Sequence, residues 1–547
     1  MLDPANLPYW EARREQHYAD GFWQDDTIYS LASKHASRAP SSYAVRDSRQ
    51  RLSYRQFVDA ADHLAGDLAA SGVQCGDRIG IWLSSRVETA IAILACARNG
   101  YVCCPSLHRN HTGAEVAALL DRTSARVLIV EQGYGADATS ATFTNDLEAP
   151  TTLYKIYRLA PDTPSTDFVA ANRHHNNPPR DDPDTIMYIA FTSGTSGLPK
   201  CVMHSHNTLL ANARTIAADW HFDSSSVLYS ISSLSHNLGF GALISAIAVG
   251  AELVIHTPKT ASLLAALTET DATFIFGVPT HALDLLGEIE RGDGVKLNRI
   301  TGFRISGAAV PTHVVSRLLG HGITPQSGYG MTEGCSHHYT LPDDDARLIT
   351  ETSGRACAGY EVKIFASEDR DLEVPVGRIG EIGGRGASLM LGYFDDDTAN
   401  AEAYNAAGWF MTGDLGRLDK NGYLTITGRK KDVIIRGGHN IYPARLEALA
   451  MQHDAIERAA AIAISDQRLG EKVCLVVELH AGSTAGAEEI LIHLETQGLS
   501  KYDLPEYFIA VDEIPVTASG KILKRVLLGS IASGSIKPHP VRRPTSA

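Results

Sequence analysis

Short apolar runs rich in β-branched residues recur along the chain and are separated by longer segments rich in Ala and Leu. Runs such as Arg78–Leu83, Arg126–Val130 and Glu252–His256 have the length and composition of buried strands. The segments between them suit helices, and this alternation favours an α/β fold with largely parallel sheets. The longest apolar stretch, Gly239–Ile255, is shorter than the ~20 residues of a membrane span. It is therefore predicted to be a buried helix that runs into a strand, with no membrane span.

Two places break this rhythm and mark the organisation of the chain. Pro, Asp and Asn crowd Ala160–Asp184, where no periodic apolar face can be drawn, so this segment is predicted to be a surface connection. The predicted strand Ile186–Phe191 follows it directly. Further on, the consecutive charged residues Arg429–Asp432 come after the predicted strand Tyr423–Thr427 and indicate a hinge between domains.

A small α/β unit is predicted beyond this hinge. Its expected elements are strands at Ala459–Ile464 and Lys472–Leu479, a helix around Ala487–Gln497 and a strand near Tyr507–Val511. From Gly529 onward the tail is rich in Ser, Gly, Pro and Arg and has almost no apolar surface to bury. It is therefore predicted to be disordered.

Composition narrows the class of protein. A chain of 547 residues, 44% hydrophobic and 20% charged, is too long for one core, so at least two domains are expected. The formal net charge of −14 argues against a large nucleic-acid interface, because phosphate backbones are held mainly by Lys and Arg. Met1–Gly21 contains no apolar core of signal-peptide length, which predicts a cytoplasmic protein. The eight cysteines, including Cys103 and Cys104, lack zinc-ligand spacing and are expected to be reduced and mostly buried.

The strongest local signal is the segment Thr192–Lys200, which follows a buried strand. Small hydroxyl residues and glycines let backbone N–H groups turn around phosphate oxygens, while Lys200 adds a positive charge. The order of glycines and lysine does not fit the Walker pattern. A flexible Gly/Ser turn would also explain the small residues, but not the Pro-Lys ending joined to a hydrophobic strand. The segment is thus interpreted as a phosphate-binding loop.

Other segments offer weaker signals of nucleotide chemistry. In Tyr329–Glu333 an aromatic ring can stack on a base, Thr332 can bond a phosphate, and Glu333 offers a hard oxygen to magnesium. Asp414 suits the two hydroxyls of a ribose, and Arg429 suits ribose or phosphate. Taken alone, the first segment is better explained as an ordinary strand-to-helix turn, and the last two residues as surface ion-pair partners.

Together, the order and spacing of these segments resemble the superfamily of acyl-CoA synthetases, peptide-synthetase adenylation domains and luciferases, and above all its bacterial acyl- and aryl-CoA ligases. The resemblance runs from about Phe22 to Leu527. The motifs that carry it are Thr192–Lys200, Tyr329–Glu333, Thr412–Asp414, Gly428–Asp432, Gly437–Pro443 and Pro515–Lys521. Any one short motif occurs often by chance, whereas chance agreement of all of them in order is negligible.

The resemblance implies a fold. A large N-terminal domain, residues 1–430, is expected to contain stacked, mostly parallel sheets with helices, together with a small β-barrel-like subdomain. A small mobile C-terminal α+β domain, residues 431–528, is expected to turn about a hinge at Lys431. Residues 529–547 are the tail predicted to be disordered.

The resemblance also implies a reaction. ATP with Mg2+ is expected to activate a carboxylic acid as acyl-AMP with release of pyrophosphate, and coenzyme A then takes the acyl group as a thioester. Lys521 is expected to be the main catalytic cation, and Thr332, Glu333 and His236 are further catalytic residues. Glu333 would hold the magnesium. The expected ATP- and AMP-binding residues are Thr192, Ser193, Gly194, Thr195, Ser196, Gly197, Lys200, Gly307, Ala308, Ser327, Gly328, Tyr329, Gly330, Met331, Thr332, Asp414, Ile426, Arg429 and Lys521. Gly437, Gly438 and His439 are expected to accommodate the pantetheine arm of coenzyme A.

The choice of acid is the property that the resemblance defines least. The pocket-facing positions map to Ser235, His236, Asn237, Gly241, Val278, Gly307, Ala308, Ser327, Gly328 and Cys335. His236 and Asn237 resemble the His-Asn pair of relatives that adenylate aryl acids, in which the Asn can bond a ring substituent. In other relatives the His is only a gate or wall. The many small residues suggest a cavity for an aromatic, alicyclic or otherwise bulky acid, and a fatty acid stays open.

Several alternatives remain at this point. Most relatives have glycine directly after the loop lysine, where this chain has Cys201. A side chain there could perturb the loop and leave an enzyme that mainly transfers a preformed adenylate. The acceptor could instead be the phosphopantetheine of a carrier protein, although no carrier domain follows Lys521 in the sequence. A non-catalytic nucleotide sensor is the alternative from another class, but the charged set Lys521, Glu333, Asp414 and Arg429 argues against it. A homodimer is also left open.

Overall fold

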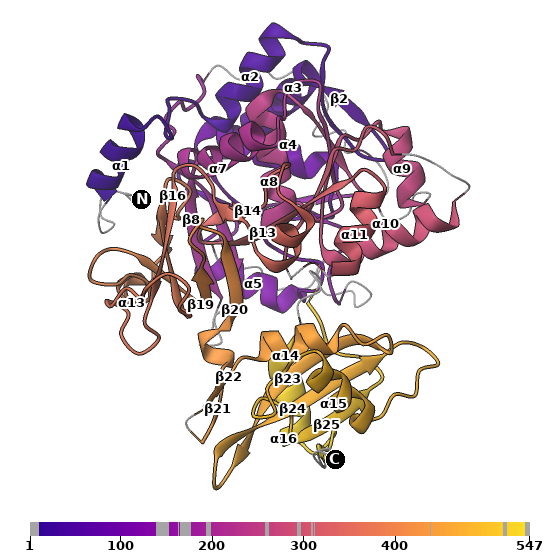
Figure 1. Cartoon of the computed structure of the whole chain (residues 1–547). Helices are drawn as coiled ribbons and strands as arrows, with labels where there is room; N and C mark the ends of the chain where they lie inside the picture. The colour runs from indigo at the N-terminus through magenta and orange to yellow at the C-terminus, as the bar shows by residue number, and fades with distance from the viewer. Residues whose placement is uncertain are drawn as a thin grey trace. The chain divides into compact units, whose positions relative to one another are not determined.

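The computed structural model describes residues 10–137, 152–161, 164, 177–192, 199–257, 262–292, 297–307, 310, 312–437, 439–517 and 522–541 (Figure 1). The chain divides into two compact units. The first consists of Met1–Glu361 and Gly384–Tyr404, and the second of Val362–Gly383 and Asn405–Ala547.

The first unit contains two mixed sheets, counted over the described residues. One has seven strands, in the order β18 (Gly392–Tyr393), β8 (Lys200–Ser205), β7 (Ile186–Thr192), β4 (Val102–Cys104), β3 (Arg78–Trp82), β5 (Val127–Glu131) and β6 (Lys155–Leu159). The other has nine, in the order β15 (Arg355–Ala356), β14 (Cys335–Tyr339), β13 (Thr324–Met331), β12 (Gly302–Ile305), β11 (Phe274–Gly277), β9 (Val227–Ser230), β10 (Glu252–Ile255), β1 (Tyr43–Arg46) and β2 (Arg51–Ser53). Antiparallel pairs lie at both edges of the nine-stranded sheet and at the β18 edge of the seven-stranded sheet, and the other pairs are parallel. The predicted α/β fold with largely parallel sheets is confirmed.

Many helices of this unit begin at a capping side chain. The helices are α1 (Trp10–Ala19), α2 (Ile28–Arg38), α3 (Tyr54–Ala70), α4 (Val87–Asn99), α5 (Gly113–Arg122), α7 (His206–Asp219), α8 (Asn237–Val249), α9 (Leu263–Glu269), α10 (Pro279–Arg291), α11 (Thr312–Gly320), α12 (Ala346–Glu351) and α13 (Asp397–Glu402). Thr27, Ser53, Thr112 and Ser205 start α2, α3, α5 and α7, and each accepts a hydrogen bond from the backbone N–H three residues on. Helix α8 ends at Gly250, whose φ of 79° favours glycine. Helices α2, α3 and α4 pack against one another (Figure 1).

The nine-stranded sheet is covered by helices on both faces. Phe303 and Ile305 of β12 share a hydrophobic core with Leu285 of α10 and Val314 of α11. Side chains alternate between the two faces of a strand, so Arg304 projects from the opposite face. Helix α8 contacts β11 and β14, and α7 contacts β14. We infer that Arg304 projects toward the face that α7 and α8 cover.

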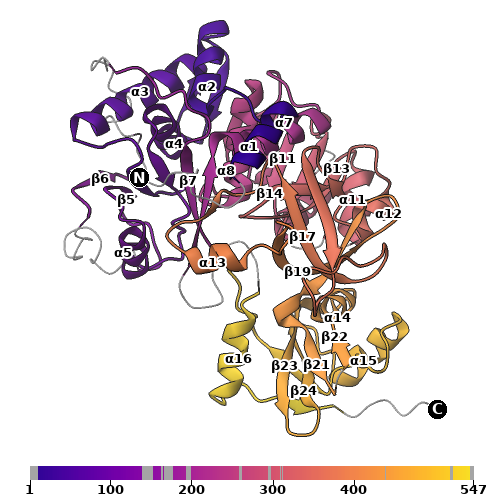
Figure 2. The same ribbon diagram turned by 90° about the vertical axis from the view of Figure 1, so that its left-hand side faces the viewer.

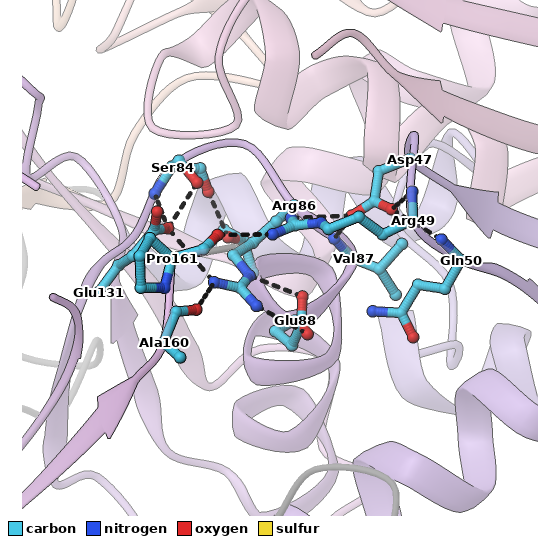
Figure 3. A network of polar contacts seen from close by, with 11 residues as sticks. Asp47, Arg49, Gln50, Ser84, Arg86, Val87, Glu88, Glu131, Ala160 and Pro161 are labelled. Atoms are coloured by element: carbon cyan, nitrogen blue, oxygen red, sulfur yellow. Dashed lines mark hydrogen bonds and ion pairs between the residues drawn. The ribbon is translucent and has the colours of Figure 1, made fainter. Parts of the chain in front are cut away.

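A buried ion pair fixes the start of α4 (Figure 3). The side chains of Arg86 and Glu88 are both fully buried. Nε and Nη2 of Arg86 donate to the two carboxylate oxygens of Glu88 over 2.7 and 3.0 Å. Nη1 donates to the carbonyl of Ala160 over 2.8 Å and lies 3.5 Å from a carboxylate oxygen of Glu131. One guanidinium therefore joins α4 to β5 and to the end of β6.

The second unit contains a four-stranded sheet and a six-stranded sheet, again counted over the described residues. The first has the order β16 (Tyr360–Phe365), β17 (Gly380–Gly386), β19 (Phe410–Leu418) and β20 (Leu424–Arg429). The second has the order β22 (His439–Ile441), β21 (Ile434–Arg436), β24 (Gly470–Leu479), β25 (Tyr507–Val511) and β26 (His539–Pro540), with β23 (Ile456–Asp466) also paired to β24. The expected smaller C-terminal domain is confirmed.

Helices cover both faces of the β23–β24 pair. Leu446 of α14 (Pro443–Ala450) and Leu491 of α15 (Ala487–Thr496) share a core with Leu475. Helix α16 (Lys524–Ala532) lies on the other face (Figure 2). Its Leu527 packs with Val476. The strands and the helix predicted for this domain therefore exist, within a few residues of their predicted bounds.

The prediction of a disordered tail from Gly529 was wrong for residues 529–541. Helix α16 continues to Ala532, and β26 pairs with β25 through His539 and Phe508. The apolar residues Ile531 and Ile536 pack on the core that contains Leu527. The few apolar side chains of the tail thus pack on a surface formed by the rest of the domain. The composition of the tail does not reveal that surface. Residues 542–547 lie outside the described residues.

Other structural predictions have mixed outcomes. The stretch Gly239–Ile255 is the body of α8 followed by β10, as expected. Most of the predicted surface connection Ala160–Asp184 lies outside the described residues. All eight cysteines are free thiols, and six of them are buried. In the part of the chain that the structure describes, no helix combines the length and apolar character needed to cross a bilayer.

Candidate active site

The phosphate-binding loop predicted from the sequence is anchored by a strand hairpin. Thr192 at the end of β7 and Lys200 at the start of β8 face each other as cross-strand partners. The intervening loop positions Ser193, Gly194, Thr195, Ser196 and Gly197 lie outside the described residues. The Nζ of Lys200 lies 4.3 Å from the centre of the Tyr393 ring, a cation–π contact that fixes the lysine at the base of the loop.

Tyr393 connects this lysine to the predicted magnesium ligand. Strand β18, which contains Tyr393, pairs with β8, and the Tyr393 hydroxyl donates to Oε1 of the buried Glu333 over 2.9 Å. Burial and the Glu333 carboxylate raise the pKa of Tyr393 above its ordinary value, so the hydroxyl keeps its proton. Lys200 and Glu333 therefore contact the same side chain, that of Tyr393. The sequence reasoning missed Tyr393, which no local pattern separates from a core tyrosine.

A second missed residue holds the backbone beside Glu333. Nε2 of the buried His204 donates to the carbonyl of Thr332 over 2.7 Å. Burial lowers the pKa of His204 to about 4, so the ring is neutral at neutral pH. The stretch around Thr332 is therefore held by a hydrogen bond from β8, the strand that begins with Lys200.

The Tyr329–Glu333 segment is a strand hairpin, and its alternative reading as a strand-to-helix turn is wrong. Met331 of β13 faces Cys335 of β14. A Cβ on Gly330 would lie 2.3 Å from the Cys335 carbonyl oxygen, so the turn requires glycine. The Tyr329 ring packs edge-on against His337, with ring centres 5.1 Å apart.

The predicted ribose-binding residues lie in the second unit. Asp414 of β19 and Arg429 of β20 face each other, and Oδ1 of Asp414 lies 3.3 Å from Nε of Arg429. Asp414 is buried, Arg429 is half-buried, and Ile426 is half-buried on the same strand as Arg429. The ion pair presents a carboxylate and a guanidinium side by side, as recognition of ribose and phosphate oxygens requires.

The residues predicted to bind coenzyme A and to act as a hinge are also in this unit. Lys431 is exposed in the 3-10 helix η3 (Lys430–Asp432), which links β20 to β21. Gly437 has a φ of 57°, and Nε2 of His439 lies 2.7 Å from Oδ1 of Asp503. Gly438 and Lys521 lie outside the described residues.

The predicted acyl pocket gathers around the first turn of α8. The Tyr188 hydroxyl donates to Oδ1 of Asn237 over 2.8 Å. No atom lies within 4 Å of a Cβ built on Gly241, one turn further along, so open space adjoins it. The His236 ring stacks on His108, with ring centres 4.0 Å apart. Burial lowers the pKa of His236 to about 4 and that of His108 to about 2, which keeps this stacked pair uncharged.

The other predicted pocket positions follow strands of the nine-stranded sheet. Val278 comes after β11, and Gly307, with a φ of 99°, comes after β12. A Cβ on Gly307 would lie 3.8 Å from Val278. Cys335 is half-buried, and burial raises the pKa of its thiol to about 12, so it is no thiolate nucleophile. Ser327 is buried and Gly328 half-buried, both in β13, and Ala308 lies outside the described residues.

Comparison with known proteins gives this arrangement a family. The AMP-binding enzyme family matches residues 32–394, and its C-terminal domain matches residues 445–521. The chain belongs to the AMP-binding enzymes. The medium-chain fatty-acid–CoA ligase of Escherichia coli is 32% identical over 536 residues, which cover 96% of this chain and 94% of that protein. A salicylyl-CoA synthase / salicylate adenylyltransferase from a Streptomyces species is 30% identical, over 96% of this chain and 98% of that protein.

Solved structures agree with this membership. The ATP-bound crystal structure of MatB from Rhodopseudomonas palustris superposes with a TM-score of 0.81 at 27% identity, covering 92% of this chain and 99% of that one. The adenylate-forming family predicted from the motifs is confirmed, and the protein is an acid–thiol ligase of the acyl-CoA synthetase class. ATP and coenzyme A are the substrates of this class.

Proposed function

We propose that this AMP-binding enzyme activates a bulky carboxylic acid, aromatic or alicyclic, as acyl-AMP and then forms its coenzyme A thioester. The observation that supports the proposal is that Lys200 and Glu333 both contact Tyr393. Lys200 lies over its ring, and Glu333 accepts a hydrogen bond from its hydroxyl. A lysine at a phosphate-binding loop beside a buried carboxylate is what an ATP–magnesium complex requires.

In the first half-reaction an oxygen of the substrate carboxylate attacks the α-phosphorus of ATP, and pyrophosphate leaves. Negative charge grows on the phosphate oxygens, and fixed cations stabilise it. We propose that Lys200, at the base of the loop, serves this task and that Lys521 reaches the reacting carboxylate.

A magnesium ion fits the donor set of Glu333. Mg2+ is commonly held by one or two carboxylates plus substrate phosphates, so a single buried glutamate suffices. Among the described residues, no group of three or more His, Cys, Asp or Glu side chains could hold a metal ion by itself. When bound, the ion would neutralise phosphate charge, and Tyr393 would keep the carboxylate of Glu333 oriented toward it.

In the second half-reaction the thiol of coenzyme A attacks the acyl carbon and AMP leaves. AMP is a good leaving group, so partial deprotonation of a thiol with a pKa near ~8.5 is sufficient and no dedicated base is needed. We propose that the domain of residues 431–528 turns about Lys431 between the half-reactions. Gly437 and Gly438 would leave room for the pantetheine arm.

The first turn of α8 supports the proposed class of acid. The Tyr188 hydroxyl donates to Oδ1 of the Asn237 amide, and we propose that the NH2 group of the same amide donates to a substrate oxygen. The neutral His236–His108 stack offers a flat wall, and Gly241 leaves space beside it. A ring with an oxygen substituent complements this surface. The Streptomyces relative is named for salicylate, which has such a ring.

Cys201 supports retention of the adenylation step. Its side chain is buried in a core that includes Cys104 and Phe191. The thiol therefore fills apolar space, and its burial gives no reason to expect a distorted phosphate-binding loop.

The test is a panel of carboxylic acids scored by pyrophosphate release, with coenzyme A and a carrier protein offered separately. The proposal predicts release with substituted aromatic or alicyclic acids, and a thioester only when coenzyme A is the acceptor. Release with straight-chain fatty acids alone would overturn the proposed acid class. A thioester formed only on the carrier protein would overturn the proposed acceptor.

A further inference from the structure

Arg304 is a fully buried arginine whose charge has no carboxylate partner among the described residues. Its Nη1 donates to Oε1 of Gln326, its register neighbour on β13, over 2.5 Å. Nε and Nη2 of Arg304 and Nε2 of Gln326 are buried and have no hydrogen-bond partner among the residues that the structure describes. The ring of Tyr339 lies 5.3 Å from the guanidinium carbon, but its hydroxyl donates to Asp219.

The unpartnered edge of Arg304, Nε and Nη2, is the edge with which three other arginines of this chain bind a carboxylate through two hydrogen bonds. Nε and Nη2 of Arg86 bind both oxygens of Glu88, and the same two atoms of Arg51 and Arg317 bind Glu252 and Glu290. These two N–H groups are parallel and match the spacing of the two carboxylate oxygens.

Burying an arginine without an anion is costly, and native proteins nearly always pair such a charge. Arg86 is equally buried and has the Glu88 carboxylate, whereas no described residue supplies a carboxylate to Arg304. Burial lowers the pKa of Arg304 to about 10, which leaves the group charged at neutral pH. A carboxylate on a bound molecule would provide this partner.

The position of Arg304 indicates where this partner would come from. Its side chain projects to the sheet face that α8 covers, the helix that begins with Asn237 and contains Gly241. A Cβ on Gly328, a predicted acyl-pocket residue, would lie 3.0 Å from Nη2 of Arg304. The guanidinium thus lies next to Gly328, on the side to which a Cβ of that residue would point.

We propose that Arg304, aided by Gln326, binds a second carboxylate on the acid, remote from the carboxylate that reacts. The substrate class is then a dicarboxylic acid, and the Nε–Nη2 edge of Arg304 receives the carboxylate that is not adenylated. This inference rests on the proposed function, because it places a further recognition element in the same acyl pocket.

The test compares dicarboxylic acids with their monomethyl esters. Aromatic, alicyclic and straight-chain diacids of increasing length are assayed by pyrophosphate release, each beside its monoester, which keeps the shape and one reactive carboxylate. The wild-type enzyme should prefer at least one diacid about 10- to 100-fold in kcat/KM, as expected for hydrogen bonds between charged groups. Arg304→Met should bring this ratio close to unity, while the exposed Arg347→Met should leave it unchanged.

A binding measurement without ATP gives an independent readout. The preferred diacid should raise the thermal unfolding temperature of the wild type more than its monoester does, and Arg304→Met should abolish the difference. If the Met variant does not fold, Arg304→Lys keeps the charge but loses the two-donor edge, and the ratio should still fall.

Two failures are distinguishable. Pyrophosphate release with no acid of any kind would refute the proposed function itself. Release with monoesters as efficient as with every diacid, or an unchanged ratio in the Arg304 variants, would overturn this inference and leave the proposed function standing.

Discussion

Replacing Tyr393 with phenylalanine separates two contacts that one side chain makes. The change removes the hydroxyl that donates to Glu333 over 2.9 Å and retains the ring on which Lys200 rests at 4.3 Å. Tyr393→Leu removes both contacts. The two variants together therefore report on the carboxylate and on the lysine separately.

The size of the effect follows from the nature of the hydrogen bond. A hydrogen bond to a charged group contributes about 1.5–3 kcal/mol, and Tyr393 and Glu333 are both buried, so water does not readily replace the donor. If this energy orients Glu333 for magnesium, Tyr393→Phe should raise the Mg2+ concentration for half-maximal activity about 10- to 100-fold. Tyr393→Leu should also weaken ATP binding, because a cation–π contact contributes a further ~0.5–2 kcal/mol.

The assay is acid-dependent ATP–pyrophosphate exchange, titrated with Mg2+ at fixed ATP and then with ATP at saturating Mg2+. Urea unfolding of each variant checks that the fold is retained. An Mg2+ dependence in Tyr393→Phe that matches the wild type would refute the reasoning. The reasoning would also be refuted if the Phe and Leu variants changed equally in the Mg2+ titration and in the ATP titration. The ring of Tyr393 would then make no contribution beyond that of its hydroxyl.

Further predictions concern the other catalytic step, the acid, the fold and pH. Lys521→Ala should lower ATP–pyrophosphate exchange at least 100-fold, on the order seen when transition-state charge stabilisation is lost, yet spare thioester formation from synthetic acyl-adenylate; equal losses in the two assays would contradict its role. Asn237→Ala should change the order of preference among substituted benzoates, and an unchanged order would exclude contact with a ring substituent. Glu88→Ala should lower the free energy of unfolding in urea by about 3–5 kcal/mol because it leaves Nε and Nη2 of the fully buried Arg86 without the carboxylate that they bind, and a loss below ~1 kcal/mol would argue against the pairing. The pKa of His204 in the folded state, about 4, lies below its ordinary 6.5, so its contribution to stability is complete above pH 6.5 and is lost as the pH falls through 4. Between pH 4 and 6.5 the unfolding free energy of His204→Asn should therefore depend less steeply on pH than that of the wild type. Identical slopes for the two proteins would contradict a neutral, buried His204.

Much of the fold could be predicted because its signals are local. The apolar stretch that forms α8 and β10 and the strands of the C-terminal domain are encoded by runs of side chains that pack together wherever they meet. The tail was mispredicted because the stability of α16 and β26 comes from surfaces contributed by residues far away in sequence, such as Val476 and Phe508. The composition of a segment shows how much apolar surface the segment itself can bury. It does not show whether the rest of the protein offers a surface on which the segment can pack.

The residues of the candidate site also fall into two groups, those that the sequence indicates and those that only the structure reveals. Motif residues such as Lys200, Glu333 and Asp414 could be proposed from order and spacing, because glycines and charges beside strands are uncommon in combination. Tyr393, His204 and Arg304 could not, because a buried tyrosine, histidine or arginine has no distinctive neighbours in sequence. Their significance appears only when the hydrogen bonds they make, or fail to make, are known.

The short strand β26 has a practical consequence for handling the protein. It occupies the outer edge of β25, and its pairing covers backbone groups that would otherwise be open to another chain. Proteolytic trimming back to α16 would uncover that edge. Shortened preparations should then associate through the exposed edge of β25 and lose solubility at high concentration. An affinity tag added after Ala547 leaves the pairing of β26 with β25 in place.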